Sequence, residues 1–133
     1  MIQKREERLQ IQICRWLKYS YPKTIFTCDL ASGMKLSIGQ AVKSKQMRSS
    51  KGMPDLMIFE PRGIYGGLFI ELKKGGTKIF KSDGTLYGKA GKSAMHIKEQ
   101  FEILNKLKSR GYCAVFGIGF TDTITKINAY MET

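Results

Sequence analysis

The stretches Asp55-Leu-Met-Ile-Phe59 and Leu68-Phe-Ile-Glu-Leu-Lys73 decide the fold. Both are short apolar runs, and the segment between them contains a proline and three glycines, so two buried strands joined by a tight reversal are predicted. Because side chains alternate across a strand, Glu71 and Lys73 point to one face. If the strands pair, Asp55 comes close to Glu71, and a divalent cation relieves the repulsion between two neighbouring carboxylates.

The rest of the chain predicts helices and strands around this pair. Apolar residues at helical spacing predict a helix over 2–20, ended by Pro22, and another over 93–110, capped by Ser93 and ended by Gly111. We also expect strands over 25–30 and 112–118, a short basic helix over 36–48, a small hairpin at Asp83-Gly84, and a last helix capped by Thr121 or Asp122. This order indicates a small α/β or α+β sheet covered by helices, in a single domain over 1–133.

The charge points to a polyanionic partner. Lysine and arginine number 23 against 11 acidic residues, giving a net charge of +12. The basic residues concentrate at 35–51 and 73–92, on either side of the candidate carboxylates. We expect DNA contacts from Lys35, Lys43, Lys45, Arg48, Lys51, Lys74, Lys78 and Lys81. The alternatives are a basic surface that only keeps the chain in solution and, for the glycine-rich stretch over 74–93, a surface insertion without function.

The cysteines, the N-terminal sequence and the lack of long apolar runs indicate where in the cell the protein is found. The three cysteines form no C-x-x-C pair and lie in apolar surroundings, which indicates reduced core residues, and a zinc site would lack partners because His96 is the only histidine. No apolar run approaches the length of a membrane span, and the charged N-terminus lacks the apolar core of a signal peptide. A cytoplasmic location is expected.

The charged residues within these apolar strands match the needs of phosphodiester hydrolysis. A cation held by Asp55 and Glu71, with the backbone carbonyl of Leu72, would relieve charge on the phosphoryl oxygens, and oxygen ligands favour Mg²⁺ or Mn²⁺. Lys73 would orient or deprotonate the attacking water, or stabilise the transition-state charge. Gln100, on the apolar stripe of its helix, would bind the water or the phosphate. The plainer alternative is an edge strand with a glutamate–lysine pair facing solvent.

A glutamate of the first helix is a further candidate. Glu6 lies on the apolar stripe with Leu9 and Ile13, whereas Glu7 is turned about one residue away. Glu6 is either a partly exposed first-turn glutamate that suits the helix dipole, or a residue that reaches the active site.

These motifs resemble the PD-(D/E)XK nuclease superfamily, and within it the VRR-NUC family, especially its small stand-alone bacteriophage members. The resemblance covers nearly the whole chain. Its segments are Glu6-Glu7-Arg-Leu-Gln10, Lys51-Gly-Met-Pro-Asp55, Phe69-Ile-Glu-Leu-Lys73, Phe80-Lys-Ser-Asp-Gly-Thr-Leu-Tyr87 and His96-Ile-Lys-Glu-Gln100. The family pattern E-x-x-L-Q aligns better with Glu6 than with Glu7.

The resemblance implies a central mixed sheet with flanking helices, a restriction-endonuclease-like core, and a divalent metal at Asp55 and Glu71. It also implies a catalytic Lys73 with supporting roles for Gln100 and Glu6. The family includes structure-specific DNA nucleases of repair and recombination, and its small members resemble Holliday-junction resolvases, which act as homodimers. Two subunits would supply the two cuts that a symmetric junction requires.

Three other functions compete with a structure-specific DNA endonuclease. A non-catalytic basic DNA-binding module explains the charge but leaves the clustering of Asp55, Glu71 and Lys73 without a reason. A sequence-specific restriction-type nuclease needs recognition elements for which 133 residues leave little room. An RNA nuclease is the third, because a basic groove does not distinguish DNA from RNA.

Overall fold

The computed structural model describes residues 2–29, 36–88 and 91–133, with the backbone alone for residues 2–6 and 92–93. The elements in chain order are α1 (Ile2–Ser20), β1 (Phe26–Cys28), α2 (Ile38–Gln46), β2 (Leu56–Ile58), β3 (Leu68–Lys73), α3 (Lys92–Ser109), β4 (Cys113–Ile118) and α4 (Gly119–Met131). Each predicted helix and strand is present, and the bounds of the regular segments shift by up to a few residues.

The sheet has four strands in the order β1-β2-β3-β4. The pairs β1–β2 and β2–β3 are antiparallel, with Leu56 opposite Ile70, and β3–β4 is parallel. Helix α3 provides the crossover that a parallel pair requires. This mixed sheet with helices confirms the α+β fold class and the expected pairing of the Asp55 and Glu71 strands.

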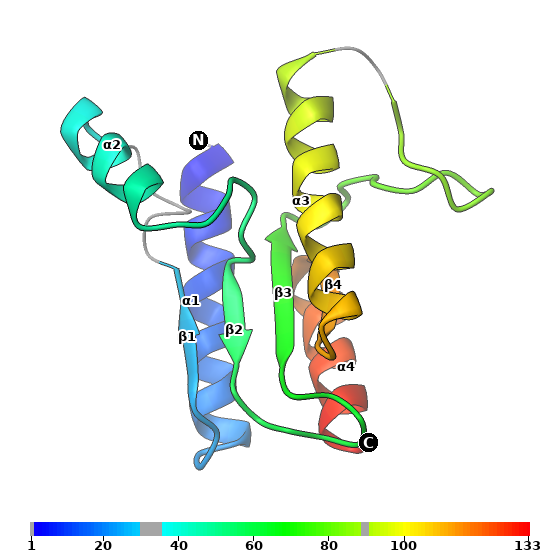
Figure 1. Ribbon diagram of the computed structural model, residues 1–133. Coiled ribbons are helices and arrows are strands. Elements are labelled where there is room, and N and C mark those ends of the chain that lie inside the picture. Colours follow the sequence, from blue (N-terminus) through cyan, green and yellow to red (C-terminus); the bar gives the residue numbers. More distant parts are fainter. Residues whose placement is uncertain (1, 30–35, 89–90) are drawn as a thin grey trace.

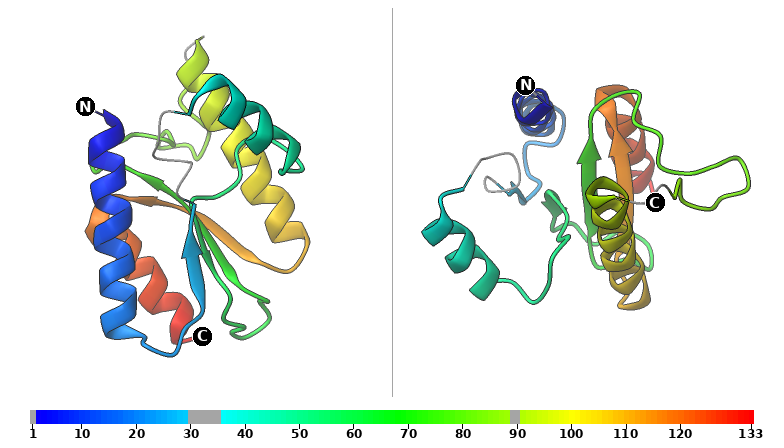
Figure 2. Two further views of the ribbon diagram at one scale, coloured as in Figure 1. Left: turned by 90° about the vertical axis from the view of Figure 1, so that its left-hand side faces the viewer. Right: turned by 90° about the horizontal axis from the view of Figure 1, so that it is seen from above.

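Helices cover the two faces of the sheet unequally (Figure 2). On one face α1 and α4 pack against the alternate residues of β2 and β3 in a core that contains Ile13, Leu56, Ile70 and Ile127. On the other face α3 packs against the opposite set of strand residues, including Phe69. Both faces of β3 are therefore buried, which explains its almost uninterrupted apolar sequence.

Helix α2 differs from the other helices because it contains no buried residue. Its start is fixed by a capping box, in which Ser37 Oγ accepts the Gln40 N–H and Gln40 Oε1 accepts the Ser37 N–H. In Figures 1 and 2 it projects beyond the β1–β2 side of the sheet. Local capping, rather than core packing, therefore defines this helix.

Several local predictions need correction. The N-cap of α3 is Gly91 and not Ser93, which lies inside the helix. The N-cap of α4 is Ile118, so neither Thr121 nor Asp122 is the cap residue; the carboxylate of Asp122 instead accepts the Ile118 N–H at 2.9 Å. The three cysteines are free as predicted, but they are half-buried at the margin of the core.

The predicted hairpin at Asp83-Gly84 is present, with a bridge between Phe80 and Leu86. Phe80 anchors it through edge-on ring contacts with Phe101 and Phe116. Within the described ranges, no helix is long and apolar enough to cross a membrane.

Candidate active site

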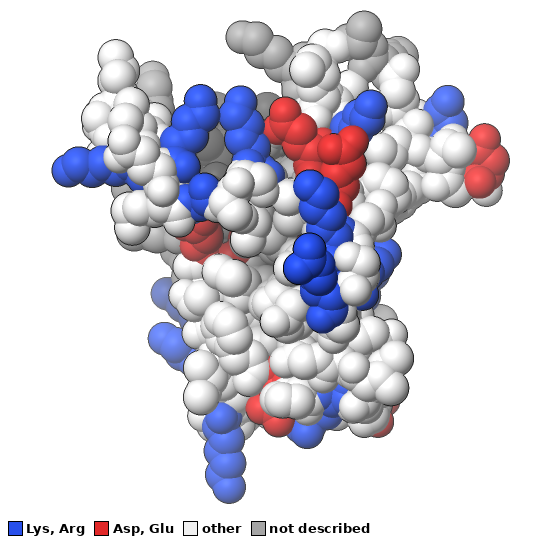
Figure 3. Space-filling model, in the orientation of Figure 1, with Lys and Arg blue, Asp and Glu red and all other residues white. Residues whose placement is uncertain are grey.

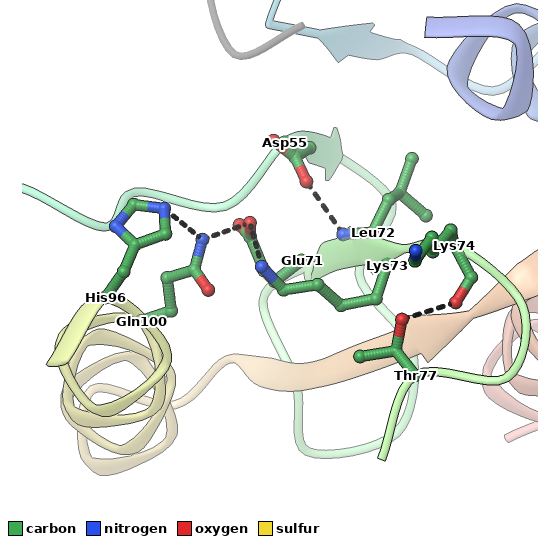
Figure 4. A network of polar contacts seen from close by, with 8 residues as sticks. All are labelled: Asp55, Glu71, Leu72, Lys73, Lys74, Thr77, His96 and Gln100. Atoms are coloured by element: carbon green, nitrogen blue, oxygen red, sulfur yellow. Dashed lines mark hydrogen bonds and ion pairs between the residues drawn. The ribbon is translucent and has the colours of Figure 1, made fainter. Parts of the chain in front are cut away.

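Two buried carboxylates lie on neighbouring strands. Asp55 immediately precedes β2 and is 6% exposed, and Glu71 on β3 is 4% exposed. The register that places Leu56 opposite Ile70 brings Asp55 opposite Glu71. Asp55 Oδ2 accepts the backbone N–H of Leu72 at 2.8 Å, which fixes this carboxylate against β3 (Figure 4). Buried carboxylates on an apolar strand are costly, so they mark a functional site.

Gln100 joins this pair from the opposite helix. It is 4% exposed, and its Nε2 donates to Glu71 Oε1 at 2.6 Å. Its Oε1 is buried and has no hydrogen-bond partner among the described residues. The amide N–H of Gln100 thus donates to Glu71, a partner that the sequence did not predict, and the remaining oxygen is available to a ligand of the site.

Lys73 lies on the same face as Glu71, as the alternation of the strand predicts. Its Nζ is 3.9 Å from Glu71 Oε1, and 13% of its side chain is exposed. An ammonium at this position carries a positive charge at the border between the buried carboxylates and solvent. The alternative interpretation, in which Glu71 and Lys73 form a solvent-facing pair on an edge strand, is therefore wrong. Strand β3 lies inside the sheet, and Glu71 is buried.

Gly52 explains how the loop before Asp55 reaches α3. Its φ is 79°, and a Cβ built there would lie 3.1 Å from the backbone nitrogen of Gln100. A side chain at this position would be strained and would press against the helix backbone. The glycine thus allows the close approach that brings Asp55 and Gln100 to one site.

One comparison with known proteins found a match, and it supports the fold. No family model and no curated protein matches the sequence. A solved structure described as a "VRR_NUC domain protein" superposes with a TM-score of 0.63 at 27% sequence identity, over 96% of this chain and 88% of that chain. This chain is therefore similar, in fold and over nearly its whole length, to a VRR-NUC domain protein.

The donor set of this candidate site fits a hard divalent cation. Two buried carboxylates and the unpartnered oxygen of Gln100 supply oxygen ligands of the kind that Mg²⁺ and Mn²⁺ prefer. No group of three or more histidine, cysteine, aspartate or glutamate residues is placed to hold a metal in the described part of the chain. The backbone N–H of Leu72 donates to Asp55. That the Leu72 carbonyl also binds the metal remains a prediction.

The first-helix glutamates are placed only in part. Glu6 belongs to α1, but its side chain lies outside the described residues. Glu7 is exposed and borders a shallow hollow with Gln10, Cys14 and Cys28. The choice of Glu6 as a site residue therefore stays a prediction.

The predicted DNA-binding residues fall into several environments. Lys43, Lys45, Lys51, Lys78 and Lys81 are exposed, and Lys74 is half-buried. Arg48 forms an ion pair with Asp29, so part of its charge is neutralised within the protein. Lys35 lies outside the described residues. Figure 3 shows lysine and arginine side chains gathered over α2 and again along α3, with acidic side chains between them.

His96 contacts the candidate site, although the sequence pattern alone assigned it no role there. Its Nε2 lies 3.1 Å from Gln100 Nε2, one helical turn before it on α3 (Figure 4). The amide can donate to this nitrogen only when the histidine is neutral with its proton on Nδ1. The spacing of four residues on a helix was the signal that could have found it.

Proposed function

We propose that this chain is a VRR-NUC-type, divalent-metal-dependent endonuclease that hydrolyses phosphodiester bonds in DNA, with branched DNA such as Holliday junctions as its substrate. The observation that carries the proposal is the buried pair Asp55 and Glu71, with Lys73 and Gln100 beside it on one face of the sheet. Two adjacent carboxylates of this kind serve no purpose in a non-catalytic DNA-binding module, since they repel phosphate.

The side chains divide the work. Asp55, Glu71 and the Oε1 of Gln100 would hold Mg²⁺ or Mn²⁺, which when bound relieves charge on the phosphoryl oxygens and orients the water. The Leu72 N–H and the Gln100 amide keep the carboxylates in place before substrate arrives. No rearrangement of these carboxylates is then needed at the moment of reaction.

Lys73 would supply a positive charge to the site. Its ammonium lies beside Glu71 at the solvent border, where the scissile phosphate would approach. A cation there stabilises the negative charge that grows on the phosphoryl oxygens, and it also orients the attacking water. Removal of this charge should reduce the rate of cutting more than it reduces DNA affinity.

The exposed lysines would bind the DNA backbone. Lys43 and Lys45 on α2, and Lys78 and Lys81 near the hairpin, lie on either side of the site in the sequence and are open to solvent. The net charge of +12 favours DNA through counterion release. Binding should therefore weaken steeply as salt rises.

The proposed substrate is branched DNA, and the proposed active form is a homodimer. The described residues of one chain form one such site, and a symmetric four-way junction needs two cuts. A homodimer with two sites acting in the cytoplasm satisfies this need.

The test is cleavage of labelled four-way junction, splayed-arm, duplex and single-stranded DNA with Mg²⁺, with Mn²⁺ and with EDTA. Wild type, Lys73→Ala and Lys98→Ala run side by side, because Lys98 is an exposed lysine of α3 that controls for loss of one charge. We expect metal-dependent cutting of branched DNA by wild type and Lys98→Ala, and loss of cutting in Lys73→Ala. Tight binding without cutting under every condition would favour the binding module.

A further inference from the structure

A second hollow lies between α2 and β2. Its volume is about 630 Å³, and residues of α2, of the loop before β2 and of β2 itself line it. Volumes of 300 to 1,000 Å³ are typical of small-ligand sites. Its apolar walls include Met47, Met53, Pro54 and Met57. We call it the α2–β2 cleft.

The cleft adjoins the candidate active site. Pro54 lines the cleft, and the next residue, Asp55, is the first carboxylate of the site. Met57 also lines it and points to the same face of β2 as Asp55, since two residues separate them on an extended chain. A strand whose phosphate reached Asp55 and Glu71 would therefore lie close to the cleft.

The lining matches an unpaired nucleobase. Methionine side chains adapt their shape and make favourable sulfur contacts with aromatic rings. Gln40, Ser44 and the pair formed by Asp29 and Arg48 supply hydrogen-bonding groups at the walls, of the kinds that bind base edges. Since α2 buries no residue of its own, the cleft is not a gap left within a packed core.

The charge at the rim matches the strand that carries such a base. Lys43 and Arg48 line the cleft, and Lys45 is exposed on the same helix. Cationic side chains around an apolar hollow combine phosphate attraction with base contact, as single-strand-binding surfaces do. A second copy of this basic chain would bring the same positive charge to the rim, which disfavours it as the occupant.

We propose that the α2–β2 cleft binds one unpaired nucleobase of the DNA strand whose backbone crosses Asp55 and Glu71. This inference rests on the proposed function for its substrate, and it narrows that substrate to DNA with an unpaired nucleotide beside the cut. Fully paired duplex, whose bases stay stacked, cannot fill the cleft without the cost of extrusion.

The experiment compares substitutions at the two ends of α2, because Ile38 is its first residue and Met47 is its C-cap. Met47 lines the cleft and is 84% exposed, whereas Ile38 is 87% exposed and lies outside the lining. Met47→Glu and Ile38→Glu thus introduce the same charge at equally exposed apolar positions, and neither removes a core contact. Binding is measured in EDTA with DNA that carries one 2-aminopurine, either unpaired or paired with thymine.

We expect wild type and Ile38→Glu to bind the unpaired DNA about tenfold more tightly than the paired DNA, and Met47→Glu to bind both equally. None of the described lining residues is aromatic, so transfer of the base from the DNA stack into the cleft should raise 2-aminopurine fluorescence. Equal affinities for both DNAs in wild type, or the same preference in all three proteins, would overturn the proposal.

Cleavage of the same DNAs with Mg²⁺ separates the two proposals. If the protein prefers the unpaired base but cuts no DNA, the base-binding cleft is supported and the proposed nuclease activity is contradicted. If it cuts DNA in the presence of metal without preferring the unpaired base, the nuclease activity is supported and the base-binding cleft is contradicted. Sedimentation of the three proteins tests whether a second copy of the chain occupies the cleft instead. If wild type shows no base preference and forms a dimer that Met47→Glu does not form, the cleft is a dimer interface.

Discussion

Gln100 on α3 donates its amide N–H to the carboxylate of Glu71 on β3 at 2.6 Å, with both side chains buried. This hydrogen bond therefore ties β3 to the helix that covers it, and it also holds a carboxylate of the candidate active site. The same contact serves stability and chemistry, so the two roles need separate measurements.

Gln100→Leu should lower the free energy of unfolding by about 1 to 3 kcal/mol, because the buried Glu71 carboxylate loses a donor. Chemical denaturation measures this change. Gln12→Leu, an exposed glutamine of α1, serves as the control and should leave stability within about 0.5 kcal/mol. Equal stability of Gln100→Leu and wild type would mean that the hydrogen bond contributes nothing to the fold.

Gly52→Ala should destabilise the protein by more than about 1 kcal/mol, because its positive φ and its contact with the α3 backbone both exclude a side chain. It should also reduce cutting, since Asp55 and Gln100 would move apart. Gly39→Ala provides the opposite control: Gly39 lies inside α2 with open space around it, so alanine should stabilise by about 0.5 to 1 kcal/mol. Thermal or denaturant unfolding that ranks the two variants in the reverse order would contradict this account.

Asp55→Asn and Asp55→Ala separate the structural role of Asp55 from its chemistry. Asparagine keeps an oxygen that accepts the Leu72 N–H but removes the charge, whereas alanine removes both. We expect both variants to lose cutting, and only Asp55→Ala to lose about 1 to 3 kcal/mol of stability. DNA affinity should stay similar or rise, since a negative charge near phosphate is gone. Cutting by Asp55→Asn at the wild-type rate would exclude Asp55 as a metal ligand.

Cys14 and Cys28 lie in contact, and their thiols share a hydrogen bond. The bond from Cys28, opposed by burial and assisted by Lys18, lowers the pKa of Cys14 to about 7, while the same bond and burial raise the pKa of Cys28. The thiolate is the reactive form, so iodoacetamide should label Cys14 increasingly as pH rises through about 7. Burial raises the pKa of Cys113, so its labelling should begin at higher pH.

Mass spectrometry of peptides labelled between about pH 6 and about pH 9 follows each thiol separately. Cys28→Ala removes the hydrogen bond and should move the labelling of Cys14 to higher pH. If Cys14 and Cys113 react with one pH profile, the thiol contact is absent in solution.

Much of the fold could be predicted from the sequence because its periodic segments are strong. The run Leu68–Lys73 is a strand to the residue, and Gln100 was placed on the core face of its helix. The charged residues Asp55, Glu71 and Lys73 stand out in the sequence because they flank or interrupt apolar strands, and the structure brings them together as strand pairing requires.

Features set by local backbone or by long-range packing could not be predicted. Helix α3 begins from Gly91 although Ser93 is the better cap by residue type. Nothing in the sequence shows that Arg48 pairs with Asp29, since the two meet only after β1 and α2 are in place. The proximity of His96 to Gln100 depends on side-chain direction, which spacing alone leaves open.

The central claim is that Asp55 and Glu71 hold a metal that drives hydrolysis. The most direct test is the single-turnover rate of cutting a four-way junction as Mg²⁺ is titrated, for wild type and Glu71→Gln. Glutamine retains a side-chain oxygen but removes the charge, so its rate should fall by at least about a hundredfold at every Mg²⁺ concentration, while wild type rises to saturation. Equal rates in the two proteins, or wild-type cutting that persists in EDTA, would contradict the account.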